Sequence, residues 1–177
     1  HLRRRIAKER QLYDETQYNF VWITDFPLFS LEDGQLSSEH HPFTAPLEED
    51  IPLLEDSPLS VRSSSYDLVL NGYEIASGSQ RIHNADLQSK IFTLLKMSPE
   101  SIKEKFGFFI EALSFGTPPH LGIALGLDRI VMVLTQAEGI REVIAFPKTQ
   151  KAADLMMEAP SEIMTSQLKE LHIKVTS

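Results

Sequence analysis

The dipeptide Asn71-Gly72 is the sequence feature that most constrains how this chain can fold. It lies between two runs rich in aromatic and β-branched residues, Tyr66–Leu70 and Tyr73–Ser77. A two-residue type I′ turn needs positive φ at both of its positions, and Asn-Gly is the pair that adopts this most readily. The sequence therefore predicts a β-hairpin in which Leu70 lies opposite Tyr73 and each further pair steps outward by one residue.

This register determines which side chains share a face of the hairpin. The face that we expect to be core carries four apolar or aromatic residues, Leu68, Leu70, Tyr73 and Ile75. Asp67 and Glu74 fall on the other face as diagonal neighbours, with Cβ atoms roughly 7–8 Å apart or a little less. Two adjacent carboxylates repel unless a cation or a proton compensates, so we expect them to share a divalent cation. A solvated acidic face is the ordinary alternative.

Arg81 lies seven residues after Glu74, so strict alternation places it on the opposite face of the strand. Either Arg81 points toward the core side, or a β-bulge at Gly78 shifts the phase and brings it round to the acidic pair. We favour the bulge, because an unpaired arginine beneath a sheet is costly. Arg81 would then offer two parallel N–H donors to a ligand carboxylate.

The segment Gly122–Leu134 predicts a short buried strand that leads into an apolar helix. Gly126 permits a tight turn between the two, and Asp128 suits the first turn of a helix. Arg129 is then expected near the helix N-terminus, where unpaired N–H groups and the helix dipole favour an anion such as phosphate. The alternative is a core segment that carries an incidental arginine.

The other segments complete a predicted α+β fold, an antiparallel sheet flanked by helices. Residues 20–28 indicate a buried strand, and residues 30–60 an acidic, proline-bearing loop that acts as a lid or substrate loop. Helices are expected after the capping residues Asn84 and Ser98, with Phe106 and Phe109, at helical spacing, in the core. Farther along, we expect a strand over 142–146, a short helix over 166–171 and a final strand over 173–175.

Composition excludes several classes of protein. The net charge of −8 opposes binding to a phosphate backbone, so the main contacts with any RNA would lie outside this chain. The absence of cysteine excludes disulfides and thiolate metal sites and agrees with a cytoplasmic location. No apolar run is long enough to span a membrane, so we expect no membrane partner.

Three segments together resemble the C-terminal half of the catalytic domain of bacterial-type class II aspartyl-tRNA synthetases. They are Glu39–Thr44, Asn71–Glu74 running on to Arg81–Asn84, and Gly122–Arg129. Segments 20–27 and 144–149 are similar as well, so the likeness covers nearly the whole chain. Residues 1–177 are therefore expected to be the C-terminal portion of such a domain, with residues 1–17 as a helix or linker from an upstream inserted domain.

The resemblance implies a site for ATP, Mg²⁺ and aspartate. By position, Arg129 would contact the ATP γ-phosphate, and Arg81 would bind the side-chain carboxylate of aspartate. Asp67 and Glu74 fall on the metal-binding carboxylates, and His40 and His41 on the paired histidines of the substrate loop, of which His40 is the favoured aspartate contact. The remaining implied ATP contacts are Glu74, Gly126, Leu127 and Asp128, and the implied catalytic residues are Glu74 and Arg129.

The implied activity is that of an aspartate–tRNA ligase, which joins aspartate to ATP as aspartyl-adenylate and then transfers it to tRNA. No segment resembles the first class II motif, which builds a dimer interface, or the second, which supplies an arginine to the α-phosphate and a loop to the adenine. The chain by itself is therefore expected to be inactive, and its parent protein to be a homodimer. Two alternatives remain: an ammonia-dependent aspartate–ammonia ligase, and a non-catalytic paralogue that acts as a binding module.

Overall fold

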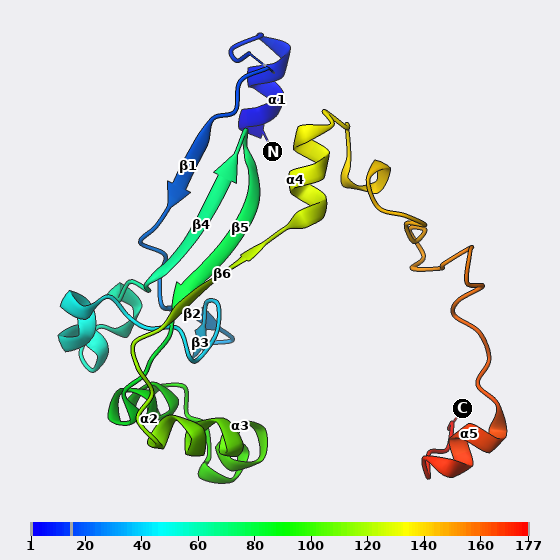
Figure 1. The fold of residues 1–177 in the computed structure, drawn as a ribbon. Helices are drawn as coiled ribbons and strands as arrows, with labels where there is room; N and C mark the ends of the chain where they lie inside the picture. The colour runs from blue at the N-terminus through cyan, green and yellow to red at the C-terminus, as the bar shows by residue number, and fades with distance from the viewer. Residues whose placement is uncertain (1, 15, 177) are drawn as a thin grey trace. The chain divides into compact units, whose positions relative to one another are not determined.

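The computed structural model describes residues 2–14 and 16–176, and its ribbon is drawn in Figure 1. The chain divides into two compact units, His1–Ile130 and Val131–Ser177. The first unit contains all of the strands and all of the residues that the sequence singles out as a candidate site.

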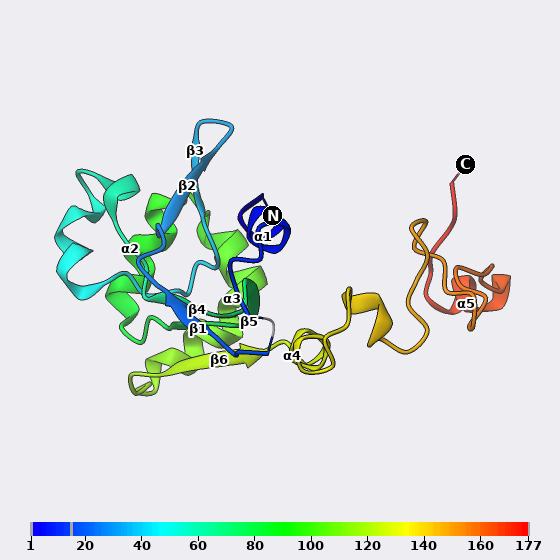
Figure 2. The ribbon, with the colours of Figure 1, turned by 90° about the horizontal axis from the view of Figure 1, so that it is seen from above.

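The first unit is built on a four-stranded antiparallel sheet with the strand order β1-β4-β5-β6. Its strands are β1 (Phe20–Ile23), β4 (Ser65–Leu70), β5 (Tyr73–Gln80) and β6 (Leu121–Leu125). A separate hairpin of β2 (Phe29–Glu32) and β3 (Gln35–Ser38) projects away from this sheet, as Figure 2 shows. The predicted α+β class is confirmed.

The turn between β4 and β5 has the predicted geometry, since Asn71 and Gly72 have φ values of 49° and 82°. The Asn71 side chain also explains why asparagine suits the first position. Its Oδ1 accepts a hydrogen bond from the Asn19 backbone N–H at 2.9 Å, and its Nδ2 donates to the Gln17 carbonyl at 2.9 Å. The tip of the hairpin therefore holds the chain that enters β1.

The β4–β5 register begins as predicted and then shifts by one residue. Leu70 lies opposite Tyr73 and Val69 opposite Glu74, but the next pair is Leu68 with Ala76. Ile75 is therefore the extra residue of a β-bulge, and the predicted bulge at Gly78 is wrong. The predicted pairs Leu68–Ile75 and Asp67–Ala76 are wrong for the same reason; Asp67 lies opposite Ser77.

Gly78 lies in regular pairing, between Tyr66 of β4 and Ile123 of β6. A side chain is excluded there because a Cβ would collide with the Gly122 carbonyl oxygen and lie 2.6 Å from the Tyr66 ring. The ring lies across this position, and its hydroxyl donates to the same Gly122 carbonyl at 2.9 Å. Close approach to a ring, rather than a bulge, is the reason for this glycine.

The helices begin at the predicted caps. Asn84 accepts a hydrogen bond from the Leu87 N–H at the start of α2 (Ala85–Leu94), and Ser98 accepts one from the Ser101 N–H at the start of α3 (Pro99–Ser114). Both helices lie beyond one end of the sheet in Figure 1. The other helices are α1 (Leu2–Glu9), α4 (Leu127–Leu134), α5 (Thr165–Glu170), and the 3-10 helices η1 (Glu48–Leu54), η2 (Pro58–Ser60) and η3 (Ile140–Glu142).

Two hydrophobic clusters form the core of the first unit. One combines residues of the segment before β4 with one residue between β5 and α2 and one residue of α2: Leu28, Phe29, Ala45, Leu54, Val61, Ile82 and Ile91. The other packs α2 against α3 around Phe43, whose ring lies edge-on to Phe92, Phe106 and Phe109 with centroids 5.7, 5.0 and 4.6 Å away. Phe43 thus anchors the segment that carries the paired histidines.

Several other predictions need correction. Residues 20–28 form only the short strand β1, which is exposed because it is the edge of the sheet; Trp22 is 56% accessible. Strand β6 is exposed rather than buried. Residues 30–60 are not an irregular loop, since they contain the β2–β3 hairpin and two 3-10 helices and contribute the fully buried Leu54 to the core. Their role as a lid or substrate loop stays a prediction.

The second unit contains little regular structure. Helix α4 begins in the first unit and ends at Leu134, and α5 confirms the predicted short helix. Residues 142–146 and 173–175 are not strands, because within residues 131–176 no neighbouring strand exists to accept their hydrogen bonds. Across the described residues, none of the helices combines the length and the apolar character that crossing a bilayer requires.

Gly78 of β5 and Gly122 of the neighbouring strand β6 give a test of this packing. Gly78→Ala should lower the free energy of unfolding by about 1–3 kcal/mol, because its Cβ would overpack against Tyr66 and the β6 backbone. Gly122→Ala is the matched control: nothing lies within 4 Å of its added Cβ, so its effect should stay within about 0.5 kcal/mol. Urea unfolding of the full-length protein measures both, and equal effects would contradict the packing described here.

Candidate functional site

One face of the main sheet brings together most of the predicted site residues. Because residues opposite each other in antiparallel strands point the same way, the register places Asp67, Val69, Glu74, Ser77 and Ser79 on one side. On β6, the same face carries Gly122 and Ala124. We call this the site face. Its centre is lined by small side chains, with the acidic pair toward one end.

Arg81 continues the alternation just beyond β5, in phase with Ser77 and Ser79. Arg81 therefore belongs to the site face, as we favoured, although the bulge that sets the phase is at Ile75. The acidic pair does not depend on the bulge: Glu74 lies opposite Val69, two residues from Asp67, so both carboxylates lie on one face as the turn predicts. The predicted arrangement on a shared face is thus confirmed by the register.

The carbonyl groups beside the bulge bind the start of α4. The Ile75 carbonyl accepts a hydrogen bond from the Gly126 N–H at 2.8 Å, and the Glu74 carbonyl accepts one from Arg129 Nη1 at 2.8 Å. The same Nη1 lies 3.2 Å from Glu74 Oε1. The turn does not require glycine, because a Cβ on Gly126 would approach nothing closer than 3.5 Å.

The Arg129 guanidinium is only partly used by the protein. Both of its hydrogen bonds involve Nη1, and Nε and Nη2 donate to no acceptor within the described residues. The Arg129 and Glu74 side chains are 47% and 48% accessible, so their ion pair is worth little and is readily shared with another charge. Leu127 is exposed, and Asp128 lies in the first turn of α4 as predicted. An anion at this helix start would meet free N–H donors.

Asp67 is half-buried, and its carboxylate has no hydrogen bond or ion pair with any part of the chain that the structure describes. The described residues also contain no group of three or more His, Cys, Asp and Glu side chains suited to a metal. Asp67 and Glu74 are therefore a two-carboxylate pair rather than a closed metal cage. Such a pair suits a cation that keeps water or ligand oxygens in its other positions.

Arg81 is a half-buried cation without an acidic partner. In the described residues, its guanidinium has a single polar contact, from Nη1 to Thr44 Oγ1 at 3.5 Å, which is at the limit for a hydrogen bond. Its backbone is well held, since its N–H donates to the His120 carbonyl at 3.0 Å and it pairs with Thr44 as an isolated bridge. A carboxylate ligand would supply the missing charge.

The two histidines differ in their surroundings. His41 stacks on Phe43 with centroids 5.2 Å apart, and its Nδ1 accepts from the Phe43 N–H at 3.3 Å. Burial, and then the positive charge of Arg81, lower the pKa of His41, so its ring is neutral at neutral pH. Both histidines are exposed at the surface, and His40 packs edge-on to Phe26. The favoured contact of His40 with aspartate stays a prediction.

Gln88 is a contributor that we did not expect from the sequence. Its side chain is 2% accessible, and its Nε2 donates to the Pro42 carbonyl at 2.9 Å, so α2 holds the histidine segment from behind. Its Oε1 has no partner within the described residues. The sequence contained a signal for this role. Gln88 lies three positions before Ile91 and interrupts the apolar face of the helix, where an unpaired polar group is costly.

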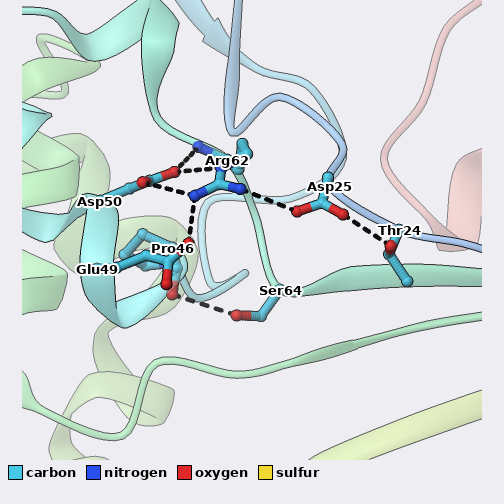
Figure 3. A network of polar contacts seen from close by, with 7 residues as sticks. All are labelled: Thr24, Asp25, Pro46, Glu49, Asp50, Arg62 and Ser64. Carbon is cyan, nitrogen blue, oxygen red and sulfur yellow. Dashed lines mark hydrogen bonds and ion pairs between the residues drawn. The ribbon is translucent and has the colours of Figure 1, made fainter.

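Arg62 is the second unexpected residue, and it holds the segments around the site together. Figure 3 shows its guanidinium between Asp50 and Asp25. Nε and Nη2 donate to the two Asp50 oxygens at 2.8 and 3.0 Å, Nη1 donates to Asp25 at 3.2 Å, and Nη2 also pairs with Glu49. The sequence contained a signal here too, since Arg62 is the only lysine or arginine between residues 11 and 80.

Asp50 is the buried member of this network. Its side chain is 8% accessible, and it also accepts a hydrogen bond from the Arg62 backbone N–H at 2.9 Å. The hydrogen bonds from Arg62 lower the pKa of Asp50 to about 2, and the same contacts raise the pKa of Arg62. At neutral pH this is therefore a fully ionised cluster in which one cation faces three carboxylates.

Comparison with known proteins gives a consistent result. Residues 3–150 match the family described as tRNA synthetases class II (D, K and N). An aspartate–tRNA(Asp/Asn) ligase of Chlamydia abortus is 85% identical over the whole chain, and one of Chlamydia muridarum is 83% identical over 99% of it. The chain spans 30% of the length of each of these relatives.

Solved structures show the same fold. A putative aspartyl-tRNA synthetase of Leishmania major Friedlin is similar with a TM-score of 0.56 and 27% identity, over 85% of this chain and 24% of that one. The aspartyl-tRNA synthetase of Entamoeba histolytica is similar with a TM-score of 0.57 and 27% identity, over 85% of this chain and 26% of that one. An asparaginyl-tRNA synthetase of the same organism, 21% identical over 85% of this chain and 28% of that one, has the same fold with a TM-score of 0.59.

The lowered pKa of Asp50 predicts how stability depends on pH. A carboxylate whose pKa is lower in the folded state stabilises that state above its unfolded pKa, near 3.8, and the contribution is lost as pH falls toward about 2. Asp50→Asn should therefore flatten the dependence of the urea midpoint on pH between about pH 4 and pH 2. Glu49→Gln is the matched control, because the Glu49 side chain is 70% accessible. An unchanged slope in Asp50→Asn would contradict this assignment.

Proposed function

Because this chain belongs to the class II tRNA synthetases of the aspartate, lysine and asparagine group, we propose that the protein that carries it is an aspartate–tRNA ligase. It activates aspartate with ATP and transfers the aspartyl group to tRNA. The names of the bacterial relatives further support aspartate as the amino acid and the tRNAs for aspartate and asparagine as the acceptors.

The observation that carries this proposal is the state of Arg81. It is half-buried, it lies on the same face as the acidic pair, and among the described residues it has no carboxylate partner. Leaving a guanidinium unpaired in such a place is costly, so its presence favours an anionic ligand. A carboxylate fits best, because a guanidinium binds it with two parallel hydrogen bonds.

Selection of aspartate over asparagine follows from the same residue. The amide of asparagine would turn an NH₂ donor toward the donors of Arg81 and leave a buried positive charge uncompensated. His41, whose pKa is lowered by burial and by the charge of Arg81, can orient the bound amino acid through a hydrogen bond without adding a second positive charge. His40 stays a predicted contact with aspartate, which a substitution of His40 would test.

ATP would bind toward the acidic pair, with its γ-phosphate on the free Nε and Nη2 donors of Arg129 and on the start of α4, where Gly126, Leu127 and Asp128 lie. Asp67 and Glu74 fit Mg²⁺, because they offer hard oxygen ligands and leave the remaining positions to water and phosphate. When bound, Mg²⁺ would neutralise charge on the phosphates. The weak Arg129–Glu74 pair can open without a large cost.

The reaction needs no nucleophile from the protein. An α-carboxylate oxygen of aspartate attacks the α-phosphorus of ATP, and pyrophosphate leaves. A ribose hydroxyl at the tRNA 3′ end then attacks the carbonyl carbon and gives up its proton, and AMP leaves. The residues of the site face contribute by holding the reactants and by neutralising charge, which are the usual sources of rate in phosphate chemistry. The contacts with adenine and with the α-phosphate would come from parts of the parent protein outside this chain.

The remaining partners are proposed on the same basis. The parent protein would be a cytoplasmic homodimer whose main tRNA contacts lie outside these residues, as the net charge of −8 favours. The ligase names of the relatives favour tRNA rather than ammonia as the acceptor. Arg81 and Arg129 both keep donors that the described residues do not use, so both are available to anionic substrates. This favours a working enzyme over a binding module. Inactivity of the isolated chain stays a prediction.

Arg81→Leu in the full-length protein tests this proposal directly. We expect kcat/KM for aspartate in aspartate-dependent ATP–pyrophosphate exchange to fall by at least about 10³-fold, while the low activity with asparagine changes little, so that most of the selectivity is lost. Arg141→Leu, a change at an exposed arginine of the second unit, is the control. A variant at Arg81 that still selects aspartate with nearly unchanged kcat/KM would refute the assignment.

Glu74→Gln tests the proposed metal pair. The amide keeps an acceptor for Arg129 but removes the charge, so the Mg²⁺ concentration for half-maximal exchange should rise and kcat should fall by about 10²-fold. The urea midpoint should not change, because the side chain is half exposed and packs against no core residue. Glu32→Gln, at the exposed end of β2, is the control. Unaltered Mg²⁺ dependence in Glu74→Gln would rule out this carboxylate as a ligand.

A further inference from the structure

We propose that Arg62 is a positioning residue for aspartate recognition, which acts on Arg81 through the intervening segment Thr44–Leu47. This inference rests on the proposed role of Arg81. Arg62 itself lies in the run that leads into β4, and its guanidinium is occupied by protein carboxylates. Its influence on a substrate would therefore be indirect.

The first step runs from Arg62 to the segment that precedes η1. Its guanidinium binds Glu49 and Asp50 in the first turn of η1, and its backbone N–H binds Asp50. Its carbonyl accepts a hydrogen bond from the Leu47 N–H at 2.9 Å. One residue thus holds η1 and the chain just before it through both its side chain and its backbone.

The second step runs along that chain toward β5. Pro46 pairs with Ser63, and Ser64 Oγ donates to the Pro46 carbonyl at 3.2 Å; Figure 3 shows this contact below the Arg62 network. The Ser64 N–H donates to the Ala45 carbonyl at 2.8 Å, and the Ala45 N–H donates to the Gln80 carbonyl at 2.9 Å. Hydrogen bonds therefore connect residues 62–64, through Ala45 and Pro46, to the end of β5.

The third step reaches the Arg81 side chain. Thr44 is 2% accessible and pairs with Arg81, and its Oγ1 is the single polar contact of that guanidinium among the described residues. Its N–H also donates to the His41 carbonyl at 3.0 Å, which ties the neutral histidine to the same segment. A shift of Thr44 would therefore move both groups that face the substrate carboxylate, and binding geometry is sensitive to shifts of about 1 Å.

Holding η1 and the segment Thr44–Leu47 in place requires an arginine. Three carboxylates surround the site of the cation, and only a planar fork can bind both Asp50 oxygens while it also reaches Asp25 and Glu49. No other lysine or arginine occurs between residues 11 and 80 to replace it. Removing the charge would leave Asp25, Glu49 and Asp50 in mutual repulsion and would release the start of η1.

The experiment compares KM for aspartate with KM for ATP in pyrophosphate exchange by the full-length protein. Arg62→Met should raise KM for aspartate by about 10-fold or more and leave KM for ATP within about twofold, because the ATP end of the site face is held by the bulge at Ile75. Arg62→Lys should restore part of the loss. A merely structural role would change both KM values together or would lower only the amount of folded enzyme.

Two controls sharpen the comparison. Lys90→Met breaks the ion pair to Glu55, at the other end of η1, and should leave KM for aspartate unchanged. In an Arg81→Leu background, Arg62→Met should add no further loss of aspartate kcat/KM, because a residue that acts only through Arg81 has nothing left to position. Additive losses would overturn the inference.

The outcomes separate this inference from the proposed function. If Arg81→Leu cripples aspartate use but Arg62→Met changes both KM values equally, the proposed function stands and the role of Arg62 is overturned. If Arg81→Leu has no effect, both fail. Should Arg62→Met lose cooperative unfolding, Arg62→Lys and Asp25→Asn decide the question instead: a rise of about threefold in KM for aspartate alone supports the inference, and an unchanged KM overturns it.

Discussion

The extra residue at Ile75 is the constraint on which the site depends. In β5 the single bulge shifts the phase, so that Glu74, Ser77 and Arg81 share one face although Glu74 and Arg81 are seven positions apart. It also directs the Glu74 and Ile75 carbonyls toward Arg129 and the start of α4. One local irregularity therefore places Arg81 on the face that carries the acidic pair, in the same strand whose carbonyls hold the start of α4.

Three arginines of the first unit differ in how far the protein satisfies them, and that difference separates scaffold from site. Arg62 is bound by three carboxylates, Arg129 shares one edge of its guanidinium with Glu74, and Arg81 has only a long contact to a hydroxyl within the described residues. In a chain with a net charge of −8, acidic partners are plentiful. A cation that remains without one is therefore held apart by the fold, and it is available to an anionic ligand.

The sequence by itself determined the features that depend on near neighbours along the chain. The Asn71-Gly72 turn needs positive φ at two adjacent positions, and the Asn84 and Ser98 caps act on N–H groups three residues away. The sequence also determined the family membership, because the motif residues can be recognised without coordinates. The acidic pair was predictable since its two members are only seven residues apart and joined by a tight turn.

Only the tertiary structure decided the features that join distant segments. Gly78 is required because the Tyr66 ring occupies the space beside it, and the bulge lies at Ile75 instead. The exposure of β1 depends on its place at the sheet edge, and the missing strands of the second unit on the lack of a neighbour there. The Arg62 network joins Asp25 to Asp50 across 25 positions of sequence. Such contacts are set by packing and ion pairing between segments, which periodicity along one segment does not encode.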